Sequence, residues 1–344
     1  MAYSYPAYMA QTGTPAGGIT INDAYVQAYK AGFEQAFQQS ESKLQPYFEQ
    51  ETQNEEFQYF DRVGTADAMA EDTTRYGDNP NSSITHDRRR IGLKDYELGK
   101  YVDEKDLKRV LTDPMNAYTQ ALLASGKRKL DDIIIDKFFG EAYAGKSGGT
   151  TKTFALGTGN INDDKIYVGT GSAGDITTAG DFGVVAGADK EGFTVGVSYG
   201  ATTTGLTLAK LRAVRTTMLR LHAIDQDEVI NCFLSAKQLD DLLGITEVVS
   251  SDFAVRKALA EGSVTTFMGF RFIHTERLPV DDAGHRRVIV CTPKALKLSV
   301  GSALKGDVWR VPAKKNIPYV YFKLSAEASR MWGEVSGEIR CNES

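Results

Sequence analysis

A run of eight residues near the middle of the chain, GEAYAGKS at 140–147, has the glycine and lysine spacing of a phosphate-binding loop. Such a loop binds phosphate because a strand leads into it and a helix leaves it, which aims backbone N–H groups at the anion. Here a long helical pattern leads in, and SGGTTKTF, a poor helix start, follows. We predict that Gly140 and Gly145 end the preceding helix, with Lys146 near the negative end of its dipole. A phosphate-binding enzyme using residues 140–147 is kept only as a remote alternative.

Two further glycine patterns lack the elements that their chemistry needs. Residues 145–149, GKSGG, match the nucleophile elbow of hydrolases, and residues 169–174, GTGSAG, match a dinucleotide-binding fingerprint. Both motifs work only where a helix follows. The glycine-rich DITTAGDFG follows the second motif instead of a helix. The sequence therefore predicts no catalytic residue and no cofactor at either place.

Metal ligands are not grouped along the chain either. The run at 162–164, NDD, lacks the spacing and terminal glutamate of a calcium loop. Cys232 and Cys291 lie in apolar runs, which predicts buried, reduced thiols. The histidines are scattered, and none pairs with a second ligand three or four residues away; they are His86, His222, His274 and His285. We predict a protein without metal, cofactor or enzymatic activity.

The densest positive cluster comprises Arg88, Arg89 and Arg90. Side chains alternate between the faces of an extended strand, so at most two of the three can converge on one partner. The cluster is short, has no interleaved aromatic residues, and belongs to a chain with a formal net charge of −5. It is therefore a poor match to a nucleic-acid footprint. We predict a salt-bridging contact between subunits, with plain solvation as the alternative.

One long helix, predicted over 113–139, is the element around which the chain is organised. Asp113 and Pro114 form a suitable start, because the Asp side chain accepts from free N–H groups and proline lacks one. At 1.5 Å per residue such a helix is roughly 40 Å long, which suits a strut across a flat molecule better than one layer of an enzyme. Gly126 leaves a gap in its apolar stripe. That stripe comprises Met115, Tyr118, Leu122, Leu130 and Ile133, and the polar face carries Gln120, Lys127, Arg128 and Asp131.

Two stretches before this helix have few apolar partners of their own. Residues 1 to about 20 predict a flexible arm. A short helix is predicted to follow it, with an aromatic stripe that would dock on its own chain or on a neighbouring subunit. Residues 57–102 predict a long hairpin with a polar tip. In a monomer this hairpin would be a disordered loop, and in an assembly it could lie on a neighbouring subunit. The strand-forming flanks favour the assembly. The predicted inter-subunit contacts are Tyr25, Tyr29, Phe33, Phe37, Arg75, Tyr76, Asp78, Asn79, Arg88, Arg89 and Arg90.

The remainder mixes helices and strands without regular repetition. A stretch rich in Gly and Thr, at about 150–205, predicts a small β-rich insertion, and an amphipathic helix, a buried strand and a helix capped by Ser235 follow it. This order predicts the α+β class. No run of eighteen apolar residues is present, which predicts no transmembrane helix. No apolar block follows the start, so we expect a soluble protein made in a cytosol without a signal peptide.

The order of these elements resembles the major capsid proteins of tailed bacteriophages, which have the Hong Kong 97-type fold. The features that carry the resemblance are the hairpin, the long helix and the block VTTFMGFRFIHTE at 264–276, which leads from a strand to a turn. The resemblance covers roughly residues 20–340. It implies an N-terminal arm at 1–50, an extended β-hairpin loop at 51–102, a peripheral domain with the spine helix at 103–149, the insertion at 150–205, an axial domain at 206–315 and closing strands of the peripheral domain at 316–344.

The resemblance also implies a function. Such a protein is structural, assembles with itself into hexamers and pentamers, and forms the icosahedral shell that encloses phage DNA. The alternative is an encapsulin-like nanocompartment shell around protein cargo. Implied partners are further copies of the chain, a scaffolding protein, a portal, a decoration protein and DNA held without sequence specificity, with no membrane. The implied localisation is the virion, after assembly in the host cytoplasm. Some members cross-link through Lys and Asn, but the loop tip offers Asn79 and Asn81 without a lysine.

Overall fold

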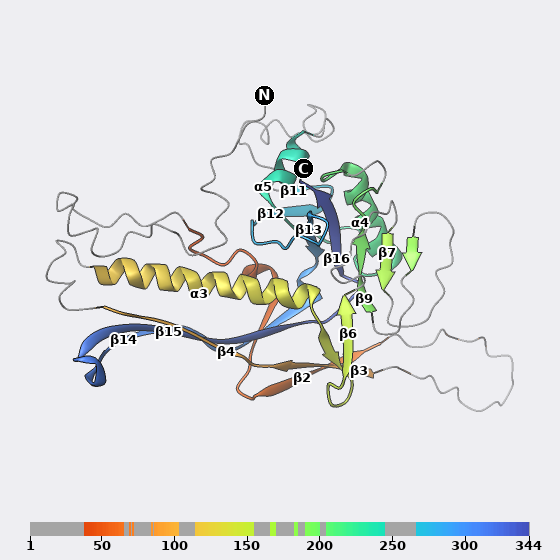
Figure 1. Ribbon diagram of the computed structural model, residues 1–344. Helices are drawn as coiled ribbons and strands as arrows, with labels where there is room; N and C mark the ends of the chain where they lie inside the picture. Colours follow the sequence, from red (N-terminus) through yellow and green to blue (C-terminus); the bar gives the residue numbers. More distant parts are fainter. Residues whose placement is uncertain are drawn as a thin grey trace, which may run out of the picture. The chain divides into compact units, whose positions relative to one another are not determined.

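The computed structural model describes residues 38–64, 69, 71, 84, 86–102, 114–154, 166–169, 182–184, 190–199, 204–244 and 266–343 (Figure 1). The chain divides into two compact units. The smaller unit includes residues 97–126 and 304–323, and the larger unit includes residues 41–96, 127–303 and 324–344. The long helix and three long strands have residues in both units.

The predicted long helix is confirmed as α3, Pro114–Phe139, with 26 residues. Within the smaller unit, its part up to Gly126 lies along β14, Leu296–Val311, and β15, Ile317–Arg330 (Figure 1). Gly126 is required by this packing, because a Cβ there would come within 2.6 Å of Leu304. The apolar residues that join helix and strands are Tyr118, Leu122, Val102, Leu304, Val320 and Phe322.

Strands β14 and β15 belong to a four-stranded sheet with the order β1-β14-β15-β4. β1 spans Glu49–Thr52 after the short 3-10 helix η2, Gln45–Tyr47, and β4 spans Asp95–Tyr101. The connection from β14 to β15 is a 3-10 helix, η5, Pro312–Lys314. Lys315 and Asn316 follow it in the left-handed conformation, with φ of 55° and 59°. A tight reversal at the end of two long strands requires such residues.

The larger unit contains a second sheet that has twelve strands within the described residues. Its main order is β11-β12-β10-β13-β16-β9-β6-β5-β3-β2, and β7 and β8 extend it beside β9. Strands from the predicted insertion, β6 (Thr150–Phe154), β7 (Ile166–Gly169), β8 (Phe182–Val184) and β9 (Lys190–Val195), are therefore part of this sheet. The other strands are β2 (Phe57–Val63), β3 (His86–Gly92), β5 (Ala142–Ala144), β10 (Ile230–Leu234), β11 (Thr266–Phe267), β12 (Phe270–His274), β13 (His285–Cys291) and β16 (Ser336–Asn342).

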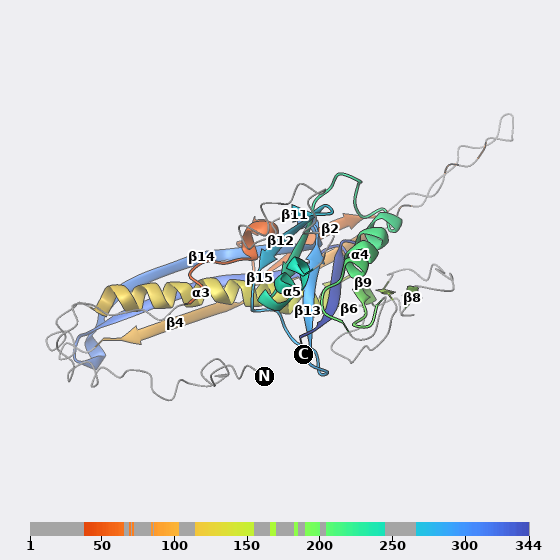
Figure 2. The same cartoon turned by 90° about the horizontal axis from the view of Figure 1, so that it is seen from above.

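The main core lies between this sheet and two helices. α4, Leu208–Arg220, packs against β9 (Figure 2). α5, Ala236–Leu243, packs against β10. As predicted, Ser235 begins α5: its side chain and that of Gln238 form a capping box. Another 3-10 helix, η4 (Pro293–Ala295), separates β13 from β14. Fully buried members of the core include Leu211, Val214, Met218, Cys232, Phe270, Val290 and Ile339.

Two details differ from the predictions. The predicted hairpin ends sooner than expected, since β3 pairs with β2 from Phe57↔Gly92 to Val63↔His86, whereas β4 joins the other sheet. Asp131, predicted on the polar face of α3, is fully buried. Its carboxylate accepts hydrogen bonds from the Ser42 hydroxyl (2.5 Å) and from the backbone N–H groups of Lys43 (3.0 Å) and Leu44 (3.1 Å). The donors belong to residues 42–44, which lie far from Asp131 in the sequence, so the helical periodicity of the 113–139 segment could not predict this burial.

Candidate subunit-contact surfaces

The hairpin of β2 and β3 presents aromatic rings and guanidinium groups on one face. Phe57 is 44% exposed and Tyr59 is 40% exposed, although both are large apolar side chains. The Arg88 guanidinium lies 5.6 Å from the Tyr59 ring centre, and that of Arg90 lies 5.1 Å from Phe57 and 5.2 Å from Tyr143. We call this set, Phe57, Tyr59, Arg88, Arg90 and Tyr143, the hairpin face.

The chemistry of the hairpin face fits a protein contact. Aromatic residues and arginine are enriched at protein interfaces, because they offer large contact areas and planar donors together. Arg88 also forms an exposed ion pair with Asp61, with Nε 2.5 Å from Oδ1. An exposed pair of this kind contributes little to folding. The Arg88 guanidinium can therefore contact a partner at little cost in folding stability.

Arg89 lies on the opposite face, as strand alternation predicts, and is completely buried. Its Nη2 donates to the Glu191 carboxylate. The same carboxylate lies 3.7 Å from Arg62 Nη1 and 3.7 Å from Arg330 Nε. We call these four residues the Glu191 cluster. This burial is a correction for Arg89, because in the folded subunit its side chain is not on a surface that another copy can reach.

The Glu191 cluster joins β2, β3, β9 and β15 through charge. Desolvation by burial lowers the pKa of Arg330 to about 10, so it remains charged at neutral pH. Burial and the neighbouring Arg89 also lower the pKa of Arg62. Arg62 further packs under the Trp332 ring at 4.2 Å. Two fully buried guanidinium groups, of Arg89 and Arg330, and the partly buried one of Arg62 surround the Glu191 carboxylate. We therefore expect Glu191 to stabilise the described part of the hairpin.

The other predicted contact residues lie outside the described residues. They are Tyr25, Tyr29, Phe33 and Phe37 before the first described segment, and Arg75, Tyr76, Asp78 and Asn79 between β2 and β3. The run 162–164 and the glycine motif after Gly169 lie outside them as well. The sequence also predicts a short capped helix at 103–111, which lies outside the described residues.

The phosphate-loop pattern at 140–147 has the wrong surroundings for its chemistry. α3 ends at Phe139, and the pattern forms β5 and the turn that leads to β6. Gly145 (φ 86°) and Gly148 (φ 71°) make this turn, so the prediction that Gly145 ends the helix is wrong, although the helix does end before Gly140. The Arg90 Nη1 donates to the Ser147 carbonyl at 3.4 Å. A strand follows where a phosphate loop requires a helix N-terminus.

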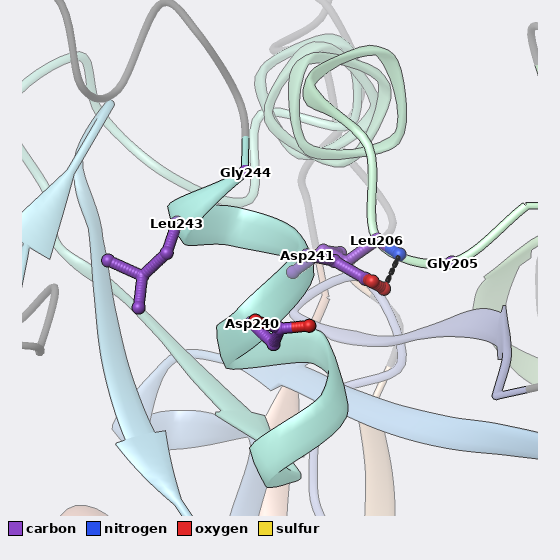
Figure 3. A pocket seen from close by; sticks show the side chains of 6 residues that line it. All are labelled: Gly205, Leu206, Asp240, Asp241, Leu243 and Gly244. Atoms are coloured by element: carbon purple, nitrogen blue, oxygen red, sulfur yellow. Dashed lines mark hydrogen bonds between the residues drawn. The ribbon is translucent and has the colours of Figure 1, made fainter. Parts of the chain in front are cut away.

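A surface hollow of about 570 Å³ lies beside α5, lined by Gly205, Leu206, Asp240, Asp241, Leu243 and Gly244. Asp241 reaches from α5 to the backbone N–H of Leu206, at 3.0 Å (Figure 3). Asp241 also pairs with Lys237 at 2.9 Å. The buried ammonium of Lys210 donates to the carbonyls of Thr204 and Gly205 on the inner side. These contacts provide structural partners for Asp241 and Lys210 beside the hollow. They do not form a pair of a nucleophile and a base.

Sequence reasoning missed a second exposed aromatic surface, in the smaller unit. Trp309 contacts the rings of Tyr319 and Tyr321, each at 5.3 Å, and Tyr101 stacks on Tyr319 at 4.3 Å. Alternation along IPYVYF was the available signal, since it places both tyrosines opposite Val320. Val320 packs towards α3, so the four rings lie on the side of the sheet that no described helix covers. We call this set, Tyr101, Trp309, Tyr319 and Tyr321, the aromatic sheet face.

The described part of the chain contains no group of side chains arranged to hold a metal ion. Among the described residues, no three His, Cys, Asp or Glu side chains are grouped as metal ligands. None of the described helices is both long and apolar enough to cross a membrane.

The buried thiols give a direct test of core integrity. Cys232 and Cys291 are buried, as predicted, and so is Cys341. Burial raises the pKa of Cys341 to about 12 and raises the pKa values of Cys232 and Cys291 as well. We expect no thiolate, and hence no reaction with a thiol reagent, in the native protein at pH 8. Three thiols should react per chain once urea unfolds it, whereas rapid labelling in buffer would contradict the core described above.

Comparisons with known proteins show which family this chain matches and which solved structures share its fold. A family model described as phage capsid protein matches residues 21–343. No curated protein matches the chain. Among solved structures, the capsid of the cyanophage P-SCSP1u has a TM-score of 0.62 and 14% identity over 100% of both chains. The capsid of the cyanophage Pam1 has a TM-score of 0.60 and 16% identity, and covers 92% of this chain and 95% of that one.

A third structure, the capsid of a native GTA particle, has a TM-score of 0.58 and 12% identity, over 98% of this chain and 99% of that chain. At such identities the structural similarities establish the fold alone, and they confirm the Hong Kong 97-type α+β architecture. The family match spans nearly the entire sequence. The chain therefore belongs to the phage capsid protein family, and its role is that of a structural protein of a capsid shell.

Proposed function

We propose that this protein assembles with itself into hexamers and pentamers that close into an icosahedral shell around phage DNA. The observation that carries the proposal is the family match over residues 21–343. The exposed hairpin face supports it, because a shell needs repeated contacts between identical subunits and not a deep pocket. The peripheral- and axial-domain boundaries implied by the resemblance remain predictions.

Further partners follow from the same proposal. We expect a scaffolding protein, a portal and a decoration protein to act with the shell. DNA lies on the inner face without sequence-specific contacts, which agrees with a formal net charge of −5. The particle is a virion assembled in the host cytoplasm. No observation on this chain favours a protein-filled nanocompartment.

Sedimentation of the purified protein, with negative-stain microscopy of the fast fractions, tests the proposal. Capsomers or closed particles tens of nanometres across are the expected result. A protein that stays monomeric or dimeric at high concentration, with crowding agent and candidate scaffold present, would contradict it. Nucleic acid in particles recovered from an infected host would identify a genome shell, and an enzyme in its place would identify a nanocompartment.

Reversing the charge of the hairpin face should block assembly without unfolding the subunit. Arg88→Glu with Arg90→Glu replaces two guanidinium groups that stack on exposed rings. We expect particle yield to fall by about tenfold or more, since like charges at an interface oppose association. The matched control is Arg271→Glu with Lys294→Glu, which makes the same charge change at two other exposed positions. Equal yields from both double variants would show that the hairpin face is not a contact.

A further inference from the structure

Two segments of the chain carry opposite and unusually concentrated charge. Residues 304–323, the end of the β14–β15 hairpin, contain five basic residues and one acidic residue. Residues 49–56, EQETQNEE, contain four glutamates and no basic residue. Both segments belong to a chain whose overall charge is nearly balanced. Such paired asymmetry is typical of surfaces that meet each other.

The basic segment is also the site of the aromatic sheet face. Trp309 is 42% exposed and Tyr101 is 40% exposed, and neither is covered by a helix in the described structure. The Lys314 ammonium lies 4.1 Å from the Tyr101 ring centre. Lys315 follows in the left-handed turn and is exposed. Large rings and ammonium groups together suit an acidic segment that also contains an apolar side chain.

The acidic segment offers that combination. Glu51 pairs with Lys297 at 3.0 Å, and Glu49 lies 3.9 Å from the same ammonium. Glu55 and Glu56 are exposed in the turn between β1 and β2, and no described basic side chain forms an ion pair with either. The exposed Phe57 follows them directly. Within the described residues, the turn thus presents two carboxylates without a cation, next to an aromatic ring.

We propose that the hairpin end of one subunit, with Trp309, Lys314 and Lys315, binds the acidic turn at Glu55 and Glu56 of a second copy. This inference rests on the proposed self-assembly. The two surfaces differ, so the contact is head-to-tail, and repetition closes a ring when the rotation between subunits permits. The partner is a second copy because the chain itself carries both charges: the basic segment has a net charge of +4, and Glu55 and Glu56 remain after Glu49 and Glu51 have paired with Lys297.

A charge exchange tests this pairing. The first variant is Lys314→Glu with Lys315→Glu, the second is Glu55→Lys with Glu56→Lys, and the third combines all four changes. The measurement is the fraction of chain that sediments as capsomers or shells, with thermal unfolding to verify the fold. Each double variant should lower this fraction by about tenfold, and the combined variant should restore it to within about twofold of the parent. Arg271→Glu with Lys294→Glu is the control for charge alone.

The outcomes separate the inference from the proposed function. If the parent protein never assembles, the proposed function fails and this contact fails with it. If the parent assembles and both double variants assemble equally well, the contact is overturned while the shell function holds. Loss in both double variants without restoration in the combined variant would also overturn it, because the two segments then bind different partners, such as an acidic scaffold. Restoration in the combined variant would establish the pairing.

Discussion

Replacing Glu191 by glutamine is expected to lower the free energy of unfolding by about 3–5 kcal/mol. Glu191 is buried and is the carboxylate shared by Arg62, Arg89 and Arg330. Removing its charge leaves Arg89 and Arg62 with the Asp87 carboxylate, 2.9 Å from Arg89 Nη1 and 3.6 Å from Arg62 Nη1. Arg330 loses the carboxylate that lies 3.7 Å from its Nε. Uncompensated buried charge is costly because low-dielectric surroundings neither solvate nor screen it.

Urea unfolding followed by tryptophan fluorescence measures this loss, since Trp332 stacks on Arg62 of the same cluster. The matched control is Glu141→Gln, an exposed position outside the Glu191 cluster, which should change stability by less than about 0.5 kcal/mol. A loss below about 1 kcal/mol for Glu191→Gln would mean that water or rearrangement compensates the arginines. The same variant should reduce shell formation, because the cluster holds β2 and β3, which carry the hairpin face.

Elements with a strong local signal were predictable from the sequence. The apolar periodicity and proline start predicted the long helix observed as α3, and the first strand-forming flank of the predicted hairpin is observed as β2. Ser235 predicted the start of α5 because capping is decided within four residues. Alternation along β3 places Arg89 on the face opposite Arg88 and Arg90, and its burial agrees with that placement. Each of these features depends on neighbours in sequence.

What could not be predicted depends on partners far apart in the chain. Arg89 is buried because Glu191, 102 residues away, accepts from it. Asp131 is buried because Ser42, 89 residues away, donates to it. Neither partner has a sequence signal, since a charged residue on a predicted surface is normally solvated. β4 is a similar case, because strand-like residues do not reveal which of two sheets they will join.

The candidate contact surfaces show the same division. The arginine cluster on β3 was identifiable by charge, but the rings of Phe57, Tyr59 and Tyr143 that flank it came from other strands. The aromatic sheet face joins residues from three strands, and only Tyr319 and Tyr321 are near in sequence. An assembly surface brings together segments that are far apart in the chain. The sequence shows which arginine and aromatic residues are present, but it does not show which of them will lie side by side on that surface.

Replacing Arg330 by lysine is expected to lower the free energy of unfolding by about 2–4 kcal/mol, although the charge is kept. The fully buried guanidinium donates from Nη1 to the carbonyls of Phe138 (2.7 Å) and Gly140 (3.0 Å), and from Nη2 to the carbonyl of Lys152 (3.0 Å). These acceptors lie at the end of α3, directly after it, and in β6. The planar guanidinium donates to all three carbonyls at once. The ammonium of a lysine ends a shorter side chain and would leave some of these carbonyls without a donor.

Hydrogen exchange of amides across 134–154, together with urea unfolding, distinguishes this role from charge balance alone. Arg330→Lys should increase exchange at the end of α3 and in β6 while leaving α4 and α5 protected, because the lost donors are local. Arg271→Lys, on an exposed position of β12, is the control and should change neither measurement. If Arg330→Lys matched the parent within about 0.5 kcal/mol, the fork would be dispensable. The contribution of Arg330 would then come from its charge beside Glu191 and above the Phe154 ring, 5.4 Å away.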